Sequence, residues 1–458
     1  MKQLFSILIV LITLATSVQA QELKPFKDGD RAVFLGNSIT HAGFYESYLW
    51  LYYMTHFPER KIEILNGGSG GDVVGQMNAR FEDDILKMDP NIVILTFGMN
   101  DSGYFEFWQD SPEKTAKKRV KKSLHDFRLL QKKFEDHPEI QPVIMSSSPY
   151  DETAKIDANN FTGKSKTLED IVKFQQEEAR KNNWPYVDLY SPMLAITKNG
   201  QAQDSSYTIT GPDRIHPGKP GHLVMAALFL KNQGLANQVV SKVEIDTKKA
   251  EILTSENASI YLLNANKNEI SFQYEAKSLP YPIDSTSSIW NNPQKLGDAL
   301  EVYPFIKEFN QEVLRVTNLE KGDYQLIIDG QDIAKFTSDS LSKGINMALL
   351  ANTPQYKQAK NVMFLNEQRA EIEGKLREYY WAQSNYFRDK GLLYADTQEA
   401  YDMASTEKEG FIGSKMGVYR TVRFPEVRKM LENNIKILVD KIYEINQPKS
   451  HKIQLKAI

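Results

Sequence analysis

The first half of the chain predicts an α/β domain built on a parallel sheet, and two observations support this. Short apolar runs of strand length recur between residues 31 and 235, and longer stretches that mix polar and apolar residues separate them. The apolar runs are 32–35, 62–65, 92–97, 142–146 and 186–189, and the helix-like stretches are 44–57, 74–88, 112–134, 165–181 and 218–232. Strands that alternate with helices are typical of a parallel sheet covered on both faces and joined by right-handed crossovers.

The second half predicts a different arrangement, an accessory α+β region that begins near residue 240. We expect strands over about 245–336 and helices over about 338–446, with a hairpin turn at Asp329-Gly330. The strand-like runs are 259–263, 269–274, 312–316, 324–328 and 331–336, the helical stretches are 355–387 and 427–445, and 283–292 is expected to be a loop. The predicted domains are therefore 21–240 and 241–458, and the sequence does not indicate what the second one does.

The N-terminal residues have the pattern of a secretory signal peptide over residues 1–20. Lys2 supplies a positive charge, residues 4–14 form a short apolar core, and Val18-Gln19-Ala20 is a small-x-small cleavage site. The apolar core is too short for a comfortable membrane span, and an uncleaved anchor is the alternative. We therefore expect an exported bacterial protein, periplasmic or secreted, with no integral membrane segment after cleavage.

The composition excludes several classes of protein. The 458 residues include no cysteine, so a disulfide scaffold and a lipid on an N-terminal cysteine are excluded. The formal net charge is −3 and no long basic run occurs, so we expect no nucleic-acid partner. No metal-ligand pattern is evident, and we expect neither a metal nor a cofactor. The 11% aromatic content suits a surface that stacks on sugar rings, and it suits large cores equally well.

Polar residues with catalytic potential follow the predicted strands directly. Ser38, the 67–71 loop and Asn100 each come after an apolar run, so they should meet at the carboxyl edge of the sheet. Asp213 and His216 are three positions apart, which lets both side chains reach one corner from one loop. A serine nucleophile needs a base, and the base needs an orienting carboxylate, so these residue types indicate acyl transfer.

Four short blocks resemble those of the SGNH (GDSL-like) hydrolase family. They are Gly36-Asn37-Ser38, with Asn where the family usually has Asp, then the glycine-rich 66–72, the intact Gly98-Met99-Asn100-Asp101, and the intact Asp213-Arg214-Ile215-His216. The resemblance covers roughly residues 30–235. It implies a three-layer α/β/α sandwich with a five-stranded parallel sheet of flavodoxin-like type, and a mechanism that needs no cofactor.

The resemblance also assigns roles to the residues of these blocks. Ser38 would be the nucleophile, His216 the general base, and Asp213 the group that orients the imidazole. The oxyanion hole would use the Ser38 backbone N–H, the Gly71 N–H and the Asn100 amide, with Gly70 as the alternative to Gly71. A competing interpretation takes Gly67-Gly68-Ser69-Gly70-Gly71 as a nucleophile elbow and Ser69 as the nucleophile.

Other residues near these blocks are weaker candidates. Asn37, His41, Tyr104 and Trp108 are candidate substrate contacts. His41 is expected to face solvent at a helix start, with a substrate contact as the alternative, and the aromatic run that holds Tyr104 and Trp108 could equally be core packing. His222 is expected to be structural, and Asp83 and Asp84 are expected to lie on a solvated helix face.

The sequence thus predicts an exported serine esterase that removes short acyl groups, most simply O-acetyl, from carbohydrates. A lipase or a broad acylesterase is the alternative enzyme. A carbohydrate-binding protein on a degenerate hydrolase scaffold is the alternative without catalysis. Partners other than an ester substrate, and the oligomeric state, are not indicated.

Overall fold

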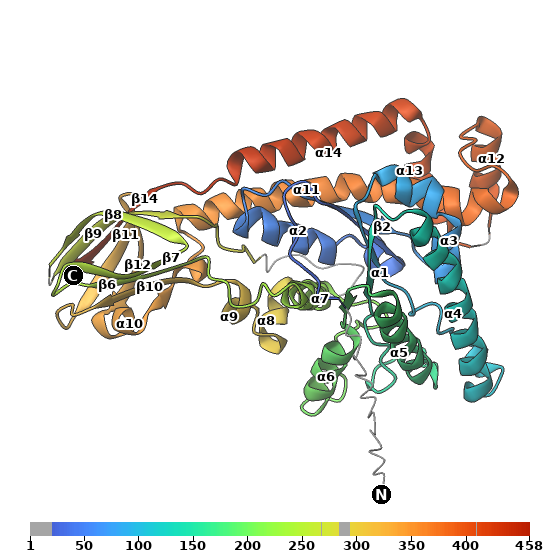
Figure 1. Ribbon diagram of the computed structural model, residues 1–458, viewed down its shortest axis with the longest axis horizontal. Coiled ribbons are helices and arrows are strands. Elements are labelled where there is room, and N and C mark those ends of the chain that lie inside the picture. The colour runs from blue at the N-terminus through green and yellow to red at the C-terminus, as the bar shows by residue number, and fades with distance from the viewer. Residues whose placement is uncertain (1–20, 267, 284–293, 409) are drawn as a thin grey trace, which may run out of the picture.

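The computed structural model describes residues 21–266, 268–283, 294–408 and 410–458. Its α/β domain lies at the right of Figure 1, a two-sheet β region lies at the left, and two long helices run between them. The predicted signal peptide at 1–20 and most of the predicted loop at 283–292 lie outside the described residues. Among the described residues, none of the helices has the length and apolar character needed to cross a bilayer.

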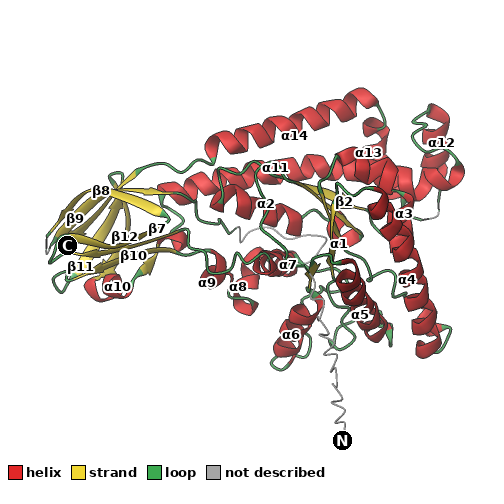
Figure 2. Cartoon of the chain, viewed as in Figure 1, coloured by secondary structure: helices red, strands yellow, loops and turns green. Residues whose placement is uncertain are grey.

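Five parallel strands form the central sheet of the α/β domain, which confirms the predicted fold class. The strands are β1 (Arg31–Gly36), β2 (Glu63–Gly68), β3 (Ile92–Leu95), β4 (Gln141–Met145) and β5 (Tyr186–Val187). Their order across the sheet is β2-β1-β3-β4-β5, and every neighbouring pair is parallel. The helices of this domain are α1 (Ser38–His41), α2 (Tyr45–His56), α3 (Val74–Ala79), α4 (Pro112–Asp136), α5 (Lys164–Asn182), α6 (Tyr190–Gln201) and α7 (Lys219–Asn232). Figure 2 shows these helices around the sheet.

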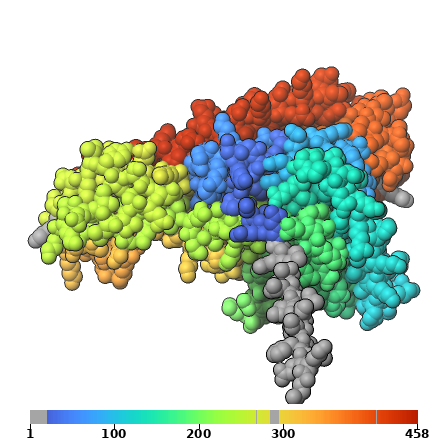
Figure 3. All heavy atoms as spheres, viewed as in Figure 1, coloured from blue at the N-terminus to red at the C-terminus, as the bar shows by residue number. Residues whose placement is uncertain are grey.

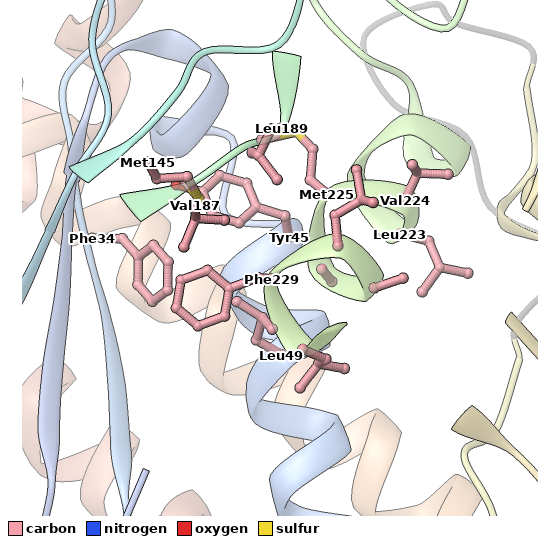
Figure 4. Packing of buried hydrophobic residues seen from close by; sticks show 14 of the residues in the cluster. Phe34, Tyr45, Leu49, Met145, Val187, Leu189, Leu223, Val224, Met225 and Phe229 are labelled. Atoms are coloured by element: carbon pink, nitrogen blue, oxygen red, sulfur yellow. The ribbon is translucent and has the colours of Figure 1, made fainter. Parts of the chain in front are cut away.

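Alternate residues of the strands enter two separate cores, as the two-residue period of a strand requires. Phe34 packs with α2 and α7 on one face, and its ring centroid lies 5.5 Å from that of Phe229. Figure 4 shows Phe34, Met145 and Val187 facing side chains of these two helices. Val33 and Leu35 point the other way, into a core with α3, α4 and α5. The sheet is therefore covered on both faces, and the domain is a three-layer sandwich.

The stretch predicted as one helix over 74–88 is broken, and this corrects the expectation for Asp84. α3 ends at Ala79, a π-helical turn covers Phe81–Ile85, and a 3-10 turn covers Leu86–Met88. Asp84 is 2% exposed and binds two arginines, so it does not lie on a solvated face. Asp83 is partly exposed, as expected, and meets Arg388 at 3.0 Å.

The β region is a sandwich of two sheets around its own core. One sheet has the order β13-β10-β6-β7 and the other has the order β12-β11-β14-β9-β8. The strands are β6 (Ser241–Asp246), β7 (Glu251–Glu256), β8 (Ala258–Ala265), β9 (Glu269–Ala276), β10 (Glu312–Thr317), β11 (Asp323–Ile328), β12 (Gln331–Thr337), β13 (Ile345–Asn346) and β14 (His451–Ala457). Asp329 and Gly330 have φ values of 51° and 80°, as a tight hairpin between β11 and β12 needs.

The helices of the second half pack partly on the α/β domain and partly on the β region. They are α8 (Ala299–Val302), α9 (Phe305–Phe309), α10 (Ser338–Lys343), α11 (Pro354–Ala382), α12 (Gln398–Thr406), α13 (Ile412–Val422) and α14 (Pro425–Ile445). The α/β domain is contacted by α8, α9, α11 and α14, and the β region is contacted by α10. The Asn366 amide of α11 donates to the Ser47 carbonyl of α2 at 3.0 Å, and Trp50 Nε1 of α2 donates to the Tyr443 hydroxyl of α14 at 3.3 Å. Figure 3 shows the α/β domain and these helices as one continuous surface. The region that we expected to be accessory therefore shares buried polar contacts with the first domain.

Candidate active site

Ser38, His216 and Asp213 lie in a hydrogen-bonded row. Ser38 Oγ is 2.8 Å from His216 Nε2, and His216 Nδ1 is 2.5 Å from Asp213 Oδ2. The other carboxylate oxygen of Asp213 accepts the backbone N–H groups of Ile215 and His216, at 3.0 and 2.9 Å. The structure thus brings together a hydroxyl, an imidazole and a carboxylate in the order that general-base activation of a serine requires.

The hydrogen bonds of Asp213 keep it ionised. Burial alone would raise the pKa of its carboxyl, but the hydrogen bond from His216, the charge of this ring when it is protonated, and the two backbone N–H groups lower the pKa below its usual value. An ionised Asp213 accepts a hydrogen bond from Nδ1–H and thereby leaves Nε2 free of a proton to face Ser38.

Local sequence explains how Ser38 is presented. It is the first residue of α1, directly after β1, and the Asn37 side chain caps the helix by accepting the Ile39 N–H at 3.0 Å. A Cβ on Gly36 would lie 2.0 Å from Thr40 Oγ1, so this turn has no room for a side chain. Asn37, predicted as a candidate substrate contact, is buried and its amide oxygen serves as this cap.

Arg214 anchors the loop that carries Asp213 and His216. Its φ is 69°, and its buried guanidinium donates to the carbonyls of Asp151 and Ala154, at 3.2 and 2.8 Å. A further bond reaches the Ile156 carbonyl at 3.0 Å. The sequence reasoning gave no role to Arg214, although a charged side chain inside the Asp-x-x-His block was a signal that could have been followed.

The loops after β1, β2 and β3 are hydrogen-bonded side by side. The Ser69 N–H donates to the Gly36 carbonyl at 3.0 Å, and Asn100 Nδ2 donates to the Asp72 carbonyl at 2.9 Å. The Tyr104 hydroxyl donates to Asn100 Oδ1 at 2.7 Å, which fixes the orientation of the amide. The amide nitrogen of Asn100 therefore points toward the glycine-rich loop.

Gly70 and Gly71 differ in what their N–H groups can do. The Gly70 N–H donates to His41 Nδ1 at 3.0 Å. The N–H groups of Gly71 and Ser38 have no acceptor within the part of the chain that the structure describes. Gly71 also has a φ of 88°, which residues with a Cβ rarely adopt. Of the two glycines, only Gly71 thus has a backbone donor to offer to a ligand.

Within the described residues, no imidazole is hydrogen-bonded to the Ser69 hydroxyl. The residue is fully buried, and its Oγ accepts a hydrogen bond from the Asn385 amide at 2.8 Å. His41 meets Gly70 instead, and its Nε2 lies 3.4 Å from Glu378. The His41 side chain is only 11% exposed, so the expectation that it faces solvent is wrong. Burial lowers the pKa of His41 below its usual value, although the hydrogen bond and negative charge of Glu378 oppose this shift.

Lys164 holds the loop that carries Asn100, although no local pattern around this residue indicates such a role. Its buried ammonium group donates to the carbonyls of Met99 and Gly103 and to the Ser102 hydroxyl. The ammonium group also lies 3.8 Å from the centre of the Tyr104 ring. Because its three acceptors lie on residues 99–103, this side chain ties the segment that contains Asn100 to the start of α5.

Aromatic side chains surround an open hollow beside the Asp213 loop. The hollow has a volume of about 460 Å³, and its lining includes Tyr104, Phe105, Phe161, Asp213 and Ile215. Trp108 stacks on Phe161 with ring centroids 5.0 Å apart and does not itself line the hollow. Tyr104 therefore combines a hydrogen bond to Asn100 with a place in the wall of a ligand-sized space.

The remaining histidine that the sequence singled out, His222, has a structural environment. His222 is fully buried in α7 and stacks on Tyr45, so it contributes to the core. Burial, reinforced by the charge of His216, lowers the pKa of His222 to about 3. Across the described residues, no group of three or more His, Cys, Asp or Glu side chains is placed to hold a metal ion.

Comparison with known proteins agrees with the fold and with these blocks. Residues 34–224 match the GDSL-like lipase/acylhydrolase family, and residues 360–447 match the diltiazem deacetylase C-terminal helical domain. The solved structure of a gut microbial diltiazem-metabolizing enzyme is 42% identical to this chain, covers 96% of this chain and 100% of its own, and superposes with a TM-score of 0.93. The acetylxylan esterase of Geobacillus stearothermophilus is 23% identical over 222 residues, which are 45% of this chain and 94% of that esterase.

The 42% identity extends over nearly the whole chain, including the β region and the long helices. The match of residues 34–224 spans the segment that holds Ser38, Asn100, Asp213 and His216. The chain therefore belongs to the SGNH (GDSL-like) hydrolase family and is an ester hydrolase.

Proposed function

We propose that this protein is an exported serine esterase that removes small acyl groups, most simply acetyl, from carbohydrates. One observation carries the proposal more than any other: Ser38 Oγ lies 2.8 Å from His216 Nε2, and the same imidazole lies 2.5 Å from Asp213. Export rests on the signal-like pattern of residues 1–20.

In the proposed reaction, His216 takes the Ser38 proton as the hydroxyl attacks the ester carbonyl. The imidazolium that forms is stabilised by the ionised Asp213, and it returns the proton to the leaving alcohol. Water then attacks the acyl-enzyme with the same assistance from His216, which releases the acid and regenerates the Ser38 hydroxyl.

Negative charge on the former carbonyl oxygen would be met by three donors: the Ser38 N–H, the Gly71 N–H and the Asn100 amide. The free backbone donors of Ser38 and Gly71 and the fixed amide of Asn100 support these roles. Preorganised donors of this kind stabilise the transition state more than the ground state, and one of them is worth about 10²–10³ in rate.

The choice of acetyl rests on the relatives, because one is an acetylxylan esterase and the C-terminal match is to a diltiazem deacetylase domain. A second candidate substrate class, acetyl esters of alcohols that carry aromatic rings, is favoured by the aromatic hollow beside Asp213. Sugar rings and aromatic rings both stack on such side chains, so this hollow suits either class.

The test measures acetate release from acetylated xylooligosaccharides, other acetylated glycans and diltiazem, together with aryl esters of increasing chain length. Ser38→Ala is the control for the site. The proposal expects release from at least one acetylated glycan, and this activity should be lost in Ser38→Ala. A preference for acyl chains of eight or more carbons would reject the acetylesterase, and activity on diltiazem alone would select the second candidate.

A further inference from the structure

We propose that Trp381, a residue of the long helix α11 in the second half of the chain, positions the peptide group whose N–H completes the oxyanion hole. This inference rests on the proposed function, because it takes the Gly71 N–H as an oxyanion donor. It makes the helical region of the second half a working part of the esterase site.

One face of the helical segment meets the glycine-rich loop at regular intervals. Glu373, Arg377, Trp381 and Asn385 are spaced four residues apart, so they line one side of α11 and the turn that follows it. Their partners along the end of β2 and the loop that follows it are the Asn66 N–H, the Gly68 carbonyl, the Gly70 carbonyl and the Ser69 hydroxyl, at 3.0, 3.2, 2.7 and 2.8 Å respectively.

The spacing explains why the first three contacts fall on alternate loop residues. A helix rises about 6 Å over four residues, and an extended chain rises about 6.6 Å over two. A helix lying beside the extended chain from β2 can therefore contact residues 66, 68 and 70 in succession. The helix and the extended chain match each other at three successive contacts, and the third contact reaches the Gly70–Gly71 peptide.

Trp381 holds this peptide by its carbonyl group. Indole Nε1–H donates to Gly70 O at 2.7 Å, and this carbonyl belongs to the same planar group as the Gly71 N–H. In a trans peptide the C=O and N–H bonds point in opposite directions. The hydrogen bond from Trp381 therefore determines the direction in which the Gly71 N–H points.

The chemistry of indole makes this contact selective for one peptide orientation. Indole Nε1–H can only donate a hydrogen bond, so its partner must be a carbonyl oxygen and cannot be an N–H. A Gly-Gly link turns over easily because neither residue has a Cβ, and a turned peptide would present its oxygen to the developing oxyanion. His41 holds the preceding peptide group, Ser69–Gly70, because its Nδ1 accepts the Gly70 N–H at 3.0 Å.

Two substitutions separate the hydrogen bond from the bulk of the side chain. Trp381→Phe keeps an aromatic ring in this buried position and removes the donor. Trp381→His keeps an N–H at the same ring position, two bonds from Cγ, and removes the second ring. Trp184→Phe is the matched control, because Trp184 packs on Phe127 and Phe134 in the opposite core.

The experiment compares kcat, KM and inhibition by a trifluoromethyl ketone, which adds to Ser38 and presents an oxyanion. For Trp381→Phe we expect kcat to fall between about 10-fold and about 100-fold with little change in KM. A misaligned donor weakens the binding of the transition state much more than the binding of the substrate. The inhibition constant should rise in parallel with the loss of kcat/KM. Trp381→His should retain more activity than Trp381→Phe, and Trp184→Phe should match the parent.

Parental kcat and inhibition constant in a folded Trp381→Phe variant would overturn the inference, as would a Trp381→His variant less active than Trp381→Phe. The Ser38→Ala variant keeps the two proposals apart. Loss of activity in Ser38→Ala with an unaffected Trp381→Phe rejects only the positioning role. Activity that survives in Ser38→Ala rejects the proposed function itself.

Discussion

Arg377 of α11 binds the Asp84 carboxylate with both terminal guanidinium nitrogens at 2.7 Å, although 293 residues separate them in the chain. Arg80 binds the same carboxylate, and it also donates to the Gly67 carbonyl at 2.8 Å. All three side chains are buried. This charged cluster joins the second half of the chain to the base of the glycine-rich loop.

Loss of Arg377 should destabilise the fold strongly. Arg377→Met leaves a buried carboxylate with one guanidinium instead of two, and breaking such a pair costs about 3–5 kcal/mol. Arg388→Met is the matched control, because its pair with Asp83 lies near the surface and such pairs are worth about 1 kcal/mol or less. Denaturant titration at pH 7 measures the free energy of unfolding of both variants, and equal losses of this free energy would contradict the expectation.

The cost of Arg377→Met should also depend on pH. Burial alone would raise the pKa of Asp84, but Arg377 and then Arg80 more than offset it, so this pKa lies below its usual value. A lowered carboxyl pKa contributes stability above the unfolded-state pKa of about 4, and this stability is lost as the pH falls through the folded-state pKa. The difference in unfolding free energy between parent and variant should therefore narrow below about pH 4, and a constant difference would contradict this.

Asp213→Asn should reduce kcat by about 10⁴ while leaving the fold intact. The asparagine oxygen can still accept the backbone N–H groups, but its amide nitrogen would face His216 Nδ1 and favour the wrong tautomer of the ring. Steady-state kinetics on an acetyl ester measures the effect. Asp204→Asn, at an exposed residue of a neighbouring loop, should behave as the parent, and an Asp213→Asn variant within tenfold of the parent would count against the proposed triad.

Lys164→Met should lower kcat by at least about tenfold with a smaller change in KM. The substitution leaves the Met99 and Gly103 carbonyls without their buried donor, so the loop that holds Asn100 is no longer tied to α5. Displacing an oxyanion donor removes part of the 10²–10³ that such a donor contributes. Lys166→Met, two residues further along α5 and exposed, is the control. A variant that changes only in thermal stability would show that Lys164 has no influence on the site.

The central fold could be predicted because its signals are local. Apolar runs such as 92–97 and the polar residues directly after them identify a parallel sheet with loops at one edge, and the structure brings Ser38 and His216 together there. The strand at His451–Ala457 carried a readable signal as well, since Ile453 and Leu455 alternate with polar residues. It was not predicted because it follows a long helix and pairs with β9 and β11, which lie more than 120 residues earlier.

The contacts behind the glycine-rich loop could not be predicted in the same way. The four-residue spacing from Glu373 to Asn385 is visible in the sequence, but nothing local says that a loop at residues 66–71 lies against that face. The same holds for Asp84. Two consecutive acidic residues are typical of a solvated surface, and only the tertiary structure places the distant Arg377 beside Asp84. Predictions that depend on a partner about 300 residues away need the tertiary structure.

Glu312 should make the stability of the protein fall as the pH rises from about 4.5 to about 7. It is fully buried at the start of β10, and one carboxylate oxygen accepts the Tyr274 hydroxyl at 2.8 Å and the Gln355 amide at 2.9 Å. Burial raises the pKa of Glu312 to about 7, although these two hydrogen bonds oppose the rise. A raised pKa means that the folded protein binds the proton more tightly than the unfolded chain does, so stability is complete below the unfolded-state pKa and is lost as the pH rises through the folded-state value.

Glu312→Gln removes this titration and keeps an oxygen for Tyr274 and Gln355. The variant should therefore gain stability relative to the parent between pH 5 and pH 8, by on the order of 3 kcal/mol at the upper end, since each pKa unit corresponds to about 1.4 kcal/mol. Denaturant titrations at several pH values measure this difference, with Glu251→Gln on the exposed strand β7 as the control. The result that contradicts this prediction is a free energy of unfolding that changes with pH in the same way in the parent and in both glutamine variants. Glu312 would then be ionised in the folded protein at all of these pH values, and its burial near the start of α11 would not make stability depend on pH.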